Sequence, residues 1–181
     1  MNTFNQLVQE RQSVRAYKNQ PVPKEHVTAC LEAARMAPSA CNSQPWKYIV
    51  VDDPQKAAQV AEGIYDPTMG INKFVTSVPV FVVLVQEKAK LMKSAEERYP
   101  SNYWADFDNG ATVAYFCLQA AELGLGTCVI GSYSEDKIKS ALAVPEDKMV
   151  RMVIALGYSE SQVIRPKSRK SLEEITSYNG Y

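Results

Sequence analysis

The sequence predicts a single domain, residues 1–181, in which helices alternate with β-strands. A chain of 181 residues fits one domain better than two. Some segments repeat apolar residues at helical spacing, whereas others are continuous β-branched runs of strand length. Hydrophobic residues make up 46% of the chain and charged residues 22%, which is the balance of an ordinary globular protein able to bury a core.

Two helices are expected in the first forty residues. The apolar residues of Thr3–Gln12 recur at helical spacing, which predicts a short helix. Pro21 and Pro23 then force a loop. A second helix is predicted over Lys24–Met36, and it stops before Pro38. Its apolar face follows the pattern i, i+3, i+4, i+7, with Val27, Cys30, Leu31, Ala34 and Ala37.

The next segment predicts two strands separated by a helix. Trp46–Val51 has the composition of a strand. Asp53 caps a helix that begins at Pro54 and ends near Gly63. Pro79–Gln86 is β-branched and apolar on both faces, so we expect this strand in the middle of a covered sheet.

A long helix is predicted over Asp106–Leu123. Small residues on this helix allow another helix to approach closely, either from the same chain or from a partner subunit. These residues are Gly110, Ala111, Ala114, Ala120 and Ala121. Gly124 and Gly126 end the helix, and the strand Thr127–Ile130 follows.

The last quarter of the chain predicts one more helix, one more strand and a tail. Ser134 is expected to cap a short helix, and Met149–Leu156 forms the final long strand. The tail, Gly157–Tyr181, is polar, and Ser171 and Glu174 form a capping box within it. Its apolar residues Leu172, Ile175, Tyr178 and Tyr181 are spaced three apart. Because such a tail cannot fold alone, we expect it to lie across a surface, such as that of a second subunit.

Charge and hydropathy exclude several function classes. Twenty basic and twenty acidic side chains cancel, which argues against a broad nucleic-acid or anionic-membrane surface. The longest aliphatic stretch, Val80–Val85, is far shorter than the roughly 20 residues of a membrane span. The N-terminus lacks the order of a signal peptide, so we expect a cytoplasmic protein.

The cysteines and the single histidine do not predict a metal site. Cys30, Cys41, Cys117 and Cys128 show no CxxC spacing, and His26 is the one histidine. We therefore expect no zinc, and we interpret all four cysteines as small hydrophobic residues kept reduced. His26 is expected at the surface, without a catalytic role.

Two sets of basic residues are candidates for binding an anion. Arg11, Ser13 and Arg15 stand at i, i+2 and i+4, so an extended segment would point all three the same way. Lys167 and Arg169, with Ser168 between them, form a similar set near the other end. Arginine binds phosphate bidentately. The alternative is that both sets are solvated surface charges.

Two further stretches bear on chemistry. The Ala37–Trp46 stretch links a helix to a strand; it is either a stiff turn in which Ser39 and Asn42 act as caps, or a rigid loop that offers polar groups to a ligand. The glycines of Gly124–Gly131 follow a helix and open a strand, which is the reverse of a dinucleotide-binding fingerprint. The sequence offers no convincing catalytic acid, base or metal, so an organic cofactor is a plausible carrier of the chemistry.

Four motifs together resemble the nitroreductase family. They are RxSxRxY at Arg11–Tyr17, the stretch Pro38–Trp46, GLGT with IG at Gly124–Gly131, and PKSR at Pro166–Arg169. The resemblance implies the α+β class, with a central, mostly antiparallel sheet flanked by helices. It also implies an intertwined homodimer with a C-terminal arm, residues 157–181, over the partner, and FMN at the subunit interface. The implied activity is transfer of hydride from NADH or NADPH to nitroaromatics, quinones or flavins.

The resemblance also implies which residues hold the flavin. Arg11, Ser13, Lys167 and Arg169 match the FMN phosphate site, and Arg15 matches a position near the phosphate end or the N1 and O2 edge. Pro38, Ser39 and Asn42 match a loop that reaches the flavin bound mainly by the other subunit. Ile130 and Gly131 match the strand end whose amides face N5, and Asn72 and Lys73 fall near positions that contact the ring. Gly131 replaces the acidic residue common in the family.

The resemblance leaves the substrate open. The pocket region, Lys88–Tyr103, matches nothing distinctive, but Tyr99, Tyr103 and the adjacent Trp104 suit stacking on an aromatic ligand. Two alternatives to a nitroreductase remain. One is another enzyme on the same fold, such as a flavin reductase, a dehalogenase or a flavin-fragmenting enzyme. The other is a non-catalytic protein that binds or stores flavin.

Overall fold

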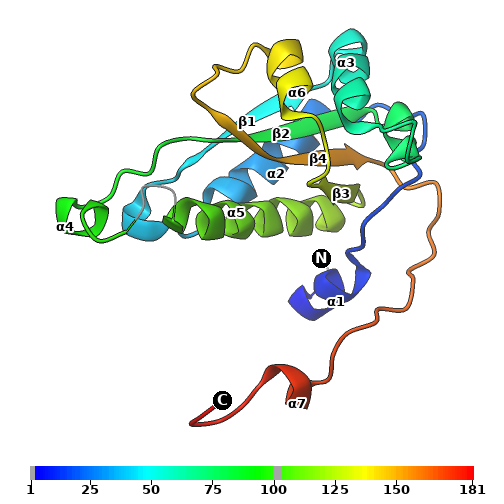
Figure 1. Ribbon diagram of the computed structural model, residues 1–181. Coiled ribbons are helices and arrows are strands. Elements are labelled where there is room, and N and C mark those ends of the chain that lie inside the picture. The colour runs from blue at the N-terminus through cyan, green and yellow to red at the C-terminus, as the bar shows by residue number, and fades with distance from the viewer. Residues whose placement is uncertain (1–2, 100–102) are drawn as a thin grey trace.

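The computed structural model describes residues 3–99 and 103–181. Its centre is a four-stranded antiparallel sheet with helices on both faces (Figure 1). The strand order is β1-β2-β4-β3. The strands are β1 (Trp46–Val51), β2 (Val80–Gln86), β3 (Gly126–Ile130) and β4 (Met149–Gly157). The α+β class and the antiparallel sheet flanked by helices are therefore confirmed.

Helices α2 and α5 cover one face of the sheet, and α3 and α6 cover the other (Figure 1). The helices are α1 (Phe4–Glu10), α2 (Lys24–Arg35), α3 (Pro54–Ile64), α4 (Lys93–Glu96), α5 (Tyr103–Glu122), α6 (Glu135–Leu142) and α7 (Leu172–Ile175). Two short 3-10 turns complete the elements, η1 (Ala40–Asn42) and η2 (Lys73–Ser77). Across the described residues, no helix is both long enough and apolar enough to cross a bilayer.

Strand β2 is the centre of the core. It pairs with β1 on one side and β4 on the other, and all of its residues are buried. Val80, Val82 and Leu84 pack toward α2 and α5. Phe81 and Val83 pack toward α3 and α6, so alternate residues of one strand supply both cores. The expected central position of this strand is confirmed.

Most helix ends follow the local signals. The Asp53 carboxylate accepts a hydrogen bond from the amide of Lys56 at 2.9 Å, with Pro54 in the first helical position. The capping box at Ser171 and Glu174 is present. Ser134 precedes α6 as expected, but its side chain makes no capping bond; its amide instead donates to Gly63 O at 2.7 Å. The expected N-cap position of Ser134 is thus confirmed, but its expected side-chain bond is absent, while its amide ties the start of α6 to α3.

The structure corrects the expectations for Cys41 and His26 and adds two short elements. Cys41 is exposed, whereas the other three cysteines are buried as small hydrophobic residues. α4 and η2 have no apolar periodicity and were not predicted. The pocket region Lys88–Tyr103 includes α4, and its residues 100–102 lie outside the described part of the chain. His26 is half-buried rather than fully at the surface.

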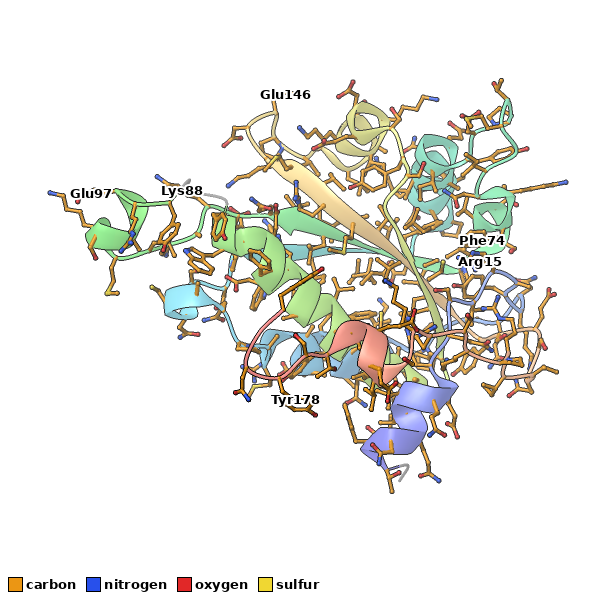
Figure 2. All side chains as sticks on the ribbon, turned by 60° about the horizontal axis from the view of Figure 1, so that its bottom comes forward. Arg15, Phe74, Lys88, Glu97, Glu146 and Tyr178 are labelled. Atoms are coloured by element: carbon orange, nitrogen blue, oxygen red, sulfur yellow. The ribbon has the colours of Figure 1, made fainter. Side chains whose placement is uncertain are left out.

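The tail divides into two parts. Residues 158–167 lie along their own chain, where the amide of Glu160 donates to Ala16 O at 3.1 Å. The remainder, with α7, extends away from the sheet on the side of α2 and α5 (Figures 1 and 2). Figure 2 labels Tyr178 on this extended part. About two fifths of residues 157–181 therefore bind the chain to which they belong.

Residues 11–17 run along the outer edge of β3, and one close contact fixes their position. The amide of Val14 donates to Thr127 O at 2.9 Å. A Cβ added at Gly126 would lie 2.6 Å from Val14 Cγ2, so this approach requires glycine. Since Val14 is buried and β-branched, it has little freedom to move aside.

We predict that Gly126→Ala lowers the free energy of unfolding by about 1–3 kcal/mol, because the added methyl group overpacks against Val14. Urea unfolding followed by circular dichroism measures the change. A Cβ at Gly131 meets no atom within 4 Å, so Gly131→Ala is the matched control, expected within about 0.5 kcal/mol of the wild type. Val14→Ala should relieve Gly126→Ala with a coupling of about 0.5–3 kcal/mol. Strict additivity of the two substitutions would contradict the contact.

Candidate functional site

The two basic sets from opposite ends of the sequence lie together. The ammonium group of Lys167 donates to Arg11 O at 2.5 Å. The guanidinium of Arg165 donates to Ser13 O, also at 2.5 Å. Arg169 is close enough to Lys167 to affect its ionisation. We call Arg11, Arg165, Lys167 and Arg169 the basic cluster.

The electrostatics of the basic cluster favour an anion. Burial and the neighbouring guanidinium groups of Arg169, Arg11 and Arg165 lower the pKa of Lys167. The Nε atom of Arg11 is buried without a hydrogen-bond partner among the described residues. A buried donor without an acceptor costs free energy. An anion such as phosphate would offset both the mutual repulsion and the missing bond.

Two residues of this site were missed by sequence reasoning. The side chain of Gln12 accepts from the amide of Arg165 at 3.2 Å and from its Nε at 3.0 Å. Gln12 also donates to Val163 O at 2.9 Å. Gln12 and Arg165 thus tie the tail to the N-terminal segment. The one sequence feature that could have indicated this site is Arg165 itself, a third basic residue beside Lys167 and Arg169.

The N-terminal set lines the outer edge of β3. Ser13 pairs with Thr127, and its side chain is close enough to the Cys128 thiol to lower the pKa of that thiol. Burial raises the pKa of Cys128, whereas the charges of Arg15 and Arg11 and the Ser13 side chain act in the opposite direction. Both guanidinium groups therefore lie near the same buried thiol.

The other end of β3 meets the residues around η2. β3 ends at Ile130, and Gly131 follows with open space around its Cα. The side chain of Asn72 donates to Ser132 O at 3.2 Å, and Asn72 itself has φ +61°. Lys73, the first residue of η2, is exposed. Asn72 thus lies next to the end of β3, whereas Ser13 lies further back along the strand, at Thr127.

Residues 38–44, which we call the 38–44 loop, hold a strained conformation. Cys41, Asn42 and Gln44 have φ values of +52°, +50° and +47°. For non-glycine residues the left-handed region costs about 1–2 kcal/mol each, and least for asparagine. Ser39 Oγ accepts from the amide of Gln44 at 3.0 Å, and Asn42 Oδ1 accepts from the Gln44 side chain at 3.1 Å. Strain of this kind is often stored where a loop meets a ligand.

The structure does not bring the 38–44 loop to the basic cluster of the same chain. The amide of Ala40 in this loop contacts Asp108 near the start of α5. The pocket beside Arg11 is lined by Ala121 at the other end of that helix. With a rise of 1.5 Å per residue, Asp108 and Ala121 are about 20 Å apart along the helix axis. Pro38, Ser39 and Asn42 are therefore remote from the residues at the basic cluster.

Aromatic side chains gather at the same end of α5. The rings of Tyr99 and Tyr103 stack with centroids 5.5 Å apart, and Trp104 meets Tyr103 edge-on at 4.8 Å. Phe107 continues the cluster along the helix, 5.7 Å from Tyr103. The expected aromatic residues of the pocket region thus contact one another beside the 38–44 loop.

Comparison with known proteins agrees with this geometry. Residues 8–158 match the model of the nitroreductase family. An NADH dehydrogenase of Thermus thermophilus is 27% identical over 192 residues, which cover 92% of this chain and 91% of the relative. An iodotyrosine deiodinase of Thermotoga neapolitana is 23% identical, with both chains fully covered. The solved structure of an FMN-dependent nitroreductase of Clostridium difficile aligns with a TM-score of 0.78 at 27% identity, covering 97% of this chain and 98% of that one.

We predict that inorganic phosphate stabilises the flavin-free protein through the basic cluster. Phosphate at about ten times its Kd adds about 1.4 kcal/mol and raises Tm by roughly 3–6 °C, measured by calorimetry against chloride at equal ionic strength. The shift should disappear in Arg11→Ala/Arg169→Ala. It should persist in Arg35→Ala, whose guanidinium is paired with Glu32 on α2. An equal shift in both variants would show that phosphate acts elsewhere.

Proposed function

The chain belongs to the nitroreductase family, and from this premise we propose that it is a single-domain, cytoplasmic, FMN-dependent oxidoreductase working as a homodimer. It transfers hydride from NADH or NADPH to a small oxidised acceptor such as a nitroaromatic, a quinone or a flavin. The observation that carries the proposal is the basic cluster, in which segments 150 residues apart converge on a place for one anion.

The residues around β3 fit FMN from end to end. Arg11, Lys167 and Arg169, with Ser13 beside them, would hold the terminal phosphate, and the unpartnered Nε of Arg11 would gain an acceptor. Arg15, whose charge acts on the Cys128 thiol of β3, would lie between this end and the ring. Because β3 is an edge strand and Gly131 leaves open space at its end, the flavin ring would lie there.

The protein's own residues would bind and orient FMN and its substrates rather than transfer protons. When bound, FMN would supply the hydride chemistry, accepting from the nicotinamide and giving to the acceptor in turn. Asn72 and Lys73 would border the ring, and the backbone of Ile130 and Gly131 would face its reactive edge. His26 stands in the first turn of α2 and receives no proton-transfer role.

A homodimer would complete the site. The outward face of α5 carries exposed Phe107 and Tyr115, with Gly110, Ala111 and Ala114 between them. A two-fold axis through the middle of this face would pair α5 with a second copy in antiparallel orientation. The 38–44 loop at one end of α5 would then lie beside the basic cluster of the partner chain. The extended arm from residue 168 lies on the same side of the sheet and would cover the partner (Figures 1 and 2).

A second candidate activity is reductive dehalogenation. The full-length likeness to an iodotyrosine deiodinase favours it, and the flavin site would be the same. An oxidant panel that contains a haloaromatic beside nitroaromatics, quinones and free flavin separates the two activities. A flavin-binding protein without catalysis would turn over none of them.

We predict that the protein purifies yellow, that heat releases FMN, and that the kinetics are ping-pong. Donor and acceptor must take turns over one ring, so double-reciprocal lines at several fixed oxidant concentrations should be parallel. Released FAD, or a colourless protein that ignores added FMN, would refute the cofactor, and intersecting lines would refute the mechanism.

Two substitutions sharpen this kinetic test. His26→Ala should leave the rate nearly unchanged, since loss of a general acid or base typically costs at least about a hundredfold. Gly131→Val should reduce the rate more than His26→Ala does, because its side chain would occupy the open space at the end of β3. The opposite ranking would mean that the ring lies elsewhere.

We predict that two truncations separate the arm from the phosphate site. A chain ending at Ser159 loses Lys167 and Arg169 and should lose both FMN binding and dimerisation. A chain ending at Lys170 keeps the basic cluster but loses α7, so its dimer should weaken while phosphate still stabilises the fold. Analytical ultracentrifugation and FMN titration measure the two effects. A folded, yellow monomer that ends at Ser159 would contradict the proposed dimer.

A further inference from the structure

Buried polar residues concentrate on one stretch of α5. Among the described residues, five polar or charged side chains are buried: Gln86, Asp108, Asn109, Thr112 and Thr127. Three of them occupy neighbouring positions on the inward face of α5. Buried polar groups are costly unless they are hydrogen-bonded, so this concentration indicates that α5 holds other segments in place.

Each of the three contacts a different segment. The Thr112 hydroxyl donates to Ala34 O at 2.7 Å, near the end of α2. The side-chain amide of Asn109 donates to the side-chain oxygen of Gln86, at the end of β2, at 3.2 Å. Asp108 accepts from the amide of Ala40, with both carboxylate oxygens at 3.2 Å from that nitrogen. Asp108 is thus the member that reaches into the 38–44 loop.

The contact with Ala40 ties a buried carboxylate of α5 to the backbone of the loop. Burial raises the pKa of Asp108, and the Ala40 amide acts in the opposite direction. The amide that it binds directly precedes Cys41 and Asn42, which are both left-handed. Among the described residues, the other hydrogen bonds of the loop run between residues 39 and 46, so Asp108 links this strained turn to the rigid helix α5.

We propose that Asp108 is a positioning residue for the FMN site of the partner chain. Its carboxylate fixes the Ala40 amide, and through it the placement of Ser39 and Asn42 in the 38–44 loop. This inference rests on the proposed function, which brings that loop to the flavin held by the second copy. Asp108 itself does not touch the cofactor; it sets where the loop stands.

The position of the loop should then affect the binding of FMN more than it affects the stability of the fold. A charge-assisted hydrogen bond to an amide is stronger than a neutral one, and its loss frees a turn that its own backbone disfavours. Asparagine at position 108 keeps an acceptor oxygen for the Ala40 amide, whereas alanine keeps none. Thr112→Val is the matched control, because it removes the bonds of the same helix to Ala34 on α2 and to the Tyr48 hydroxyl on β1, and it leaves the loop contact intact.

The experiment compares full-length Asp108→Ala, Asp108→Asn and Thr112→Val with the wild type, each with and without FMN. It measures the Kd of FMN by fluorescence quenching, the visible absorbance of the bound flavin, and the Tm of the flavin-free protein. Asp108→Ala should weaken FMN binding about tenfold or more and shift the flavin absorbance bands. Asp108→Asn should bind within about threefold of the wild type. Thr112→Val should lower Tm while leaving the Kd within about threefold.

Two results would overturn the inference. One is an Asp108→Ala protein with wild-type FMN affinity and spectrum. The other is a loss of affinity that follows the loss of Tm equally in Asp108→Ala and Thr112→Val, which would mark a purely structural role. Both are distinct from failure of the proposed function, in which the wild-type protein itself would take up no FMN. If Asp108→Ala fails to fold, Asp108→Asn decides the question. FMN affinity equal to that of Thr112→Val, with an unshifted flavin spectrum, supports the role of residue 108 as an acceptor. A loss of FMN affinity of tenfold or more in Asp108→Asn overturns it.

Discussion

The close approach of Val14 to Gly126 is the contact on which the site depends. With a Cβ at position 126 lying 2.6 Å from Val14 Cγ2, the N-terminal segment can lie on the edge of β3 only when that residue is glycine. This placement brings Ser13 to Thr127 and presents Arg11 to the returning tail. A single packing constraint in the sheet thus sets the position of a charged cluster at the surface.

Helix α5 serves both the fold and the proposed assembly. Its inward face holds the ends of α2 and β2 and the 38–44 loop through buried polar bonds, whereas its outward face is apolar and exposed. Because the helix is rigid and has 20 residues, it separates the loop from the basic cluster of the same chain. A ligand that contacts both the 38–44 loop and the basic cluster is therefore bound more simply between two chains than by one chain.

Sequence patterns predicted the regular elements well, for identifiable reasons. The bounds of β1 agree, and those of α3 nearly so, because Asp53, Pro54 and the β-branched strand are local signals. The sequence could identify the two basic sets but could not show that they lie together, since no local pattern indicates that Gln12 contacts Arg165. The left-handed Cys41 and Gln44 carry no sequence signal, because their conformation is imposed by contacts such as that of Asp108 with Ala40. Ser134 stands at the predicted N-cap, but no local pattern shows that its amide bonds Gly63 of α3.

The clasp between the N-terminal segment and the tail has a consequence for how the protein is made. Its hydrogen bonds join residues 151 to 156 positions apart. During synthesis, Arg11 and Gln12 leave the ribosome long before their partners Val163, Arg165 and Lys167. Strands β1 and β2 can pair long before then, since long-range contacts are the slowest to close. A nascent chain can therefore pair β1 with β2 before its anion site forms, and a cofactor held by that site binds only once Lys167 and Arg169 have left the ribosome.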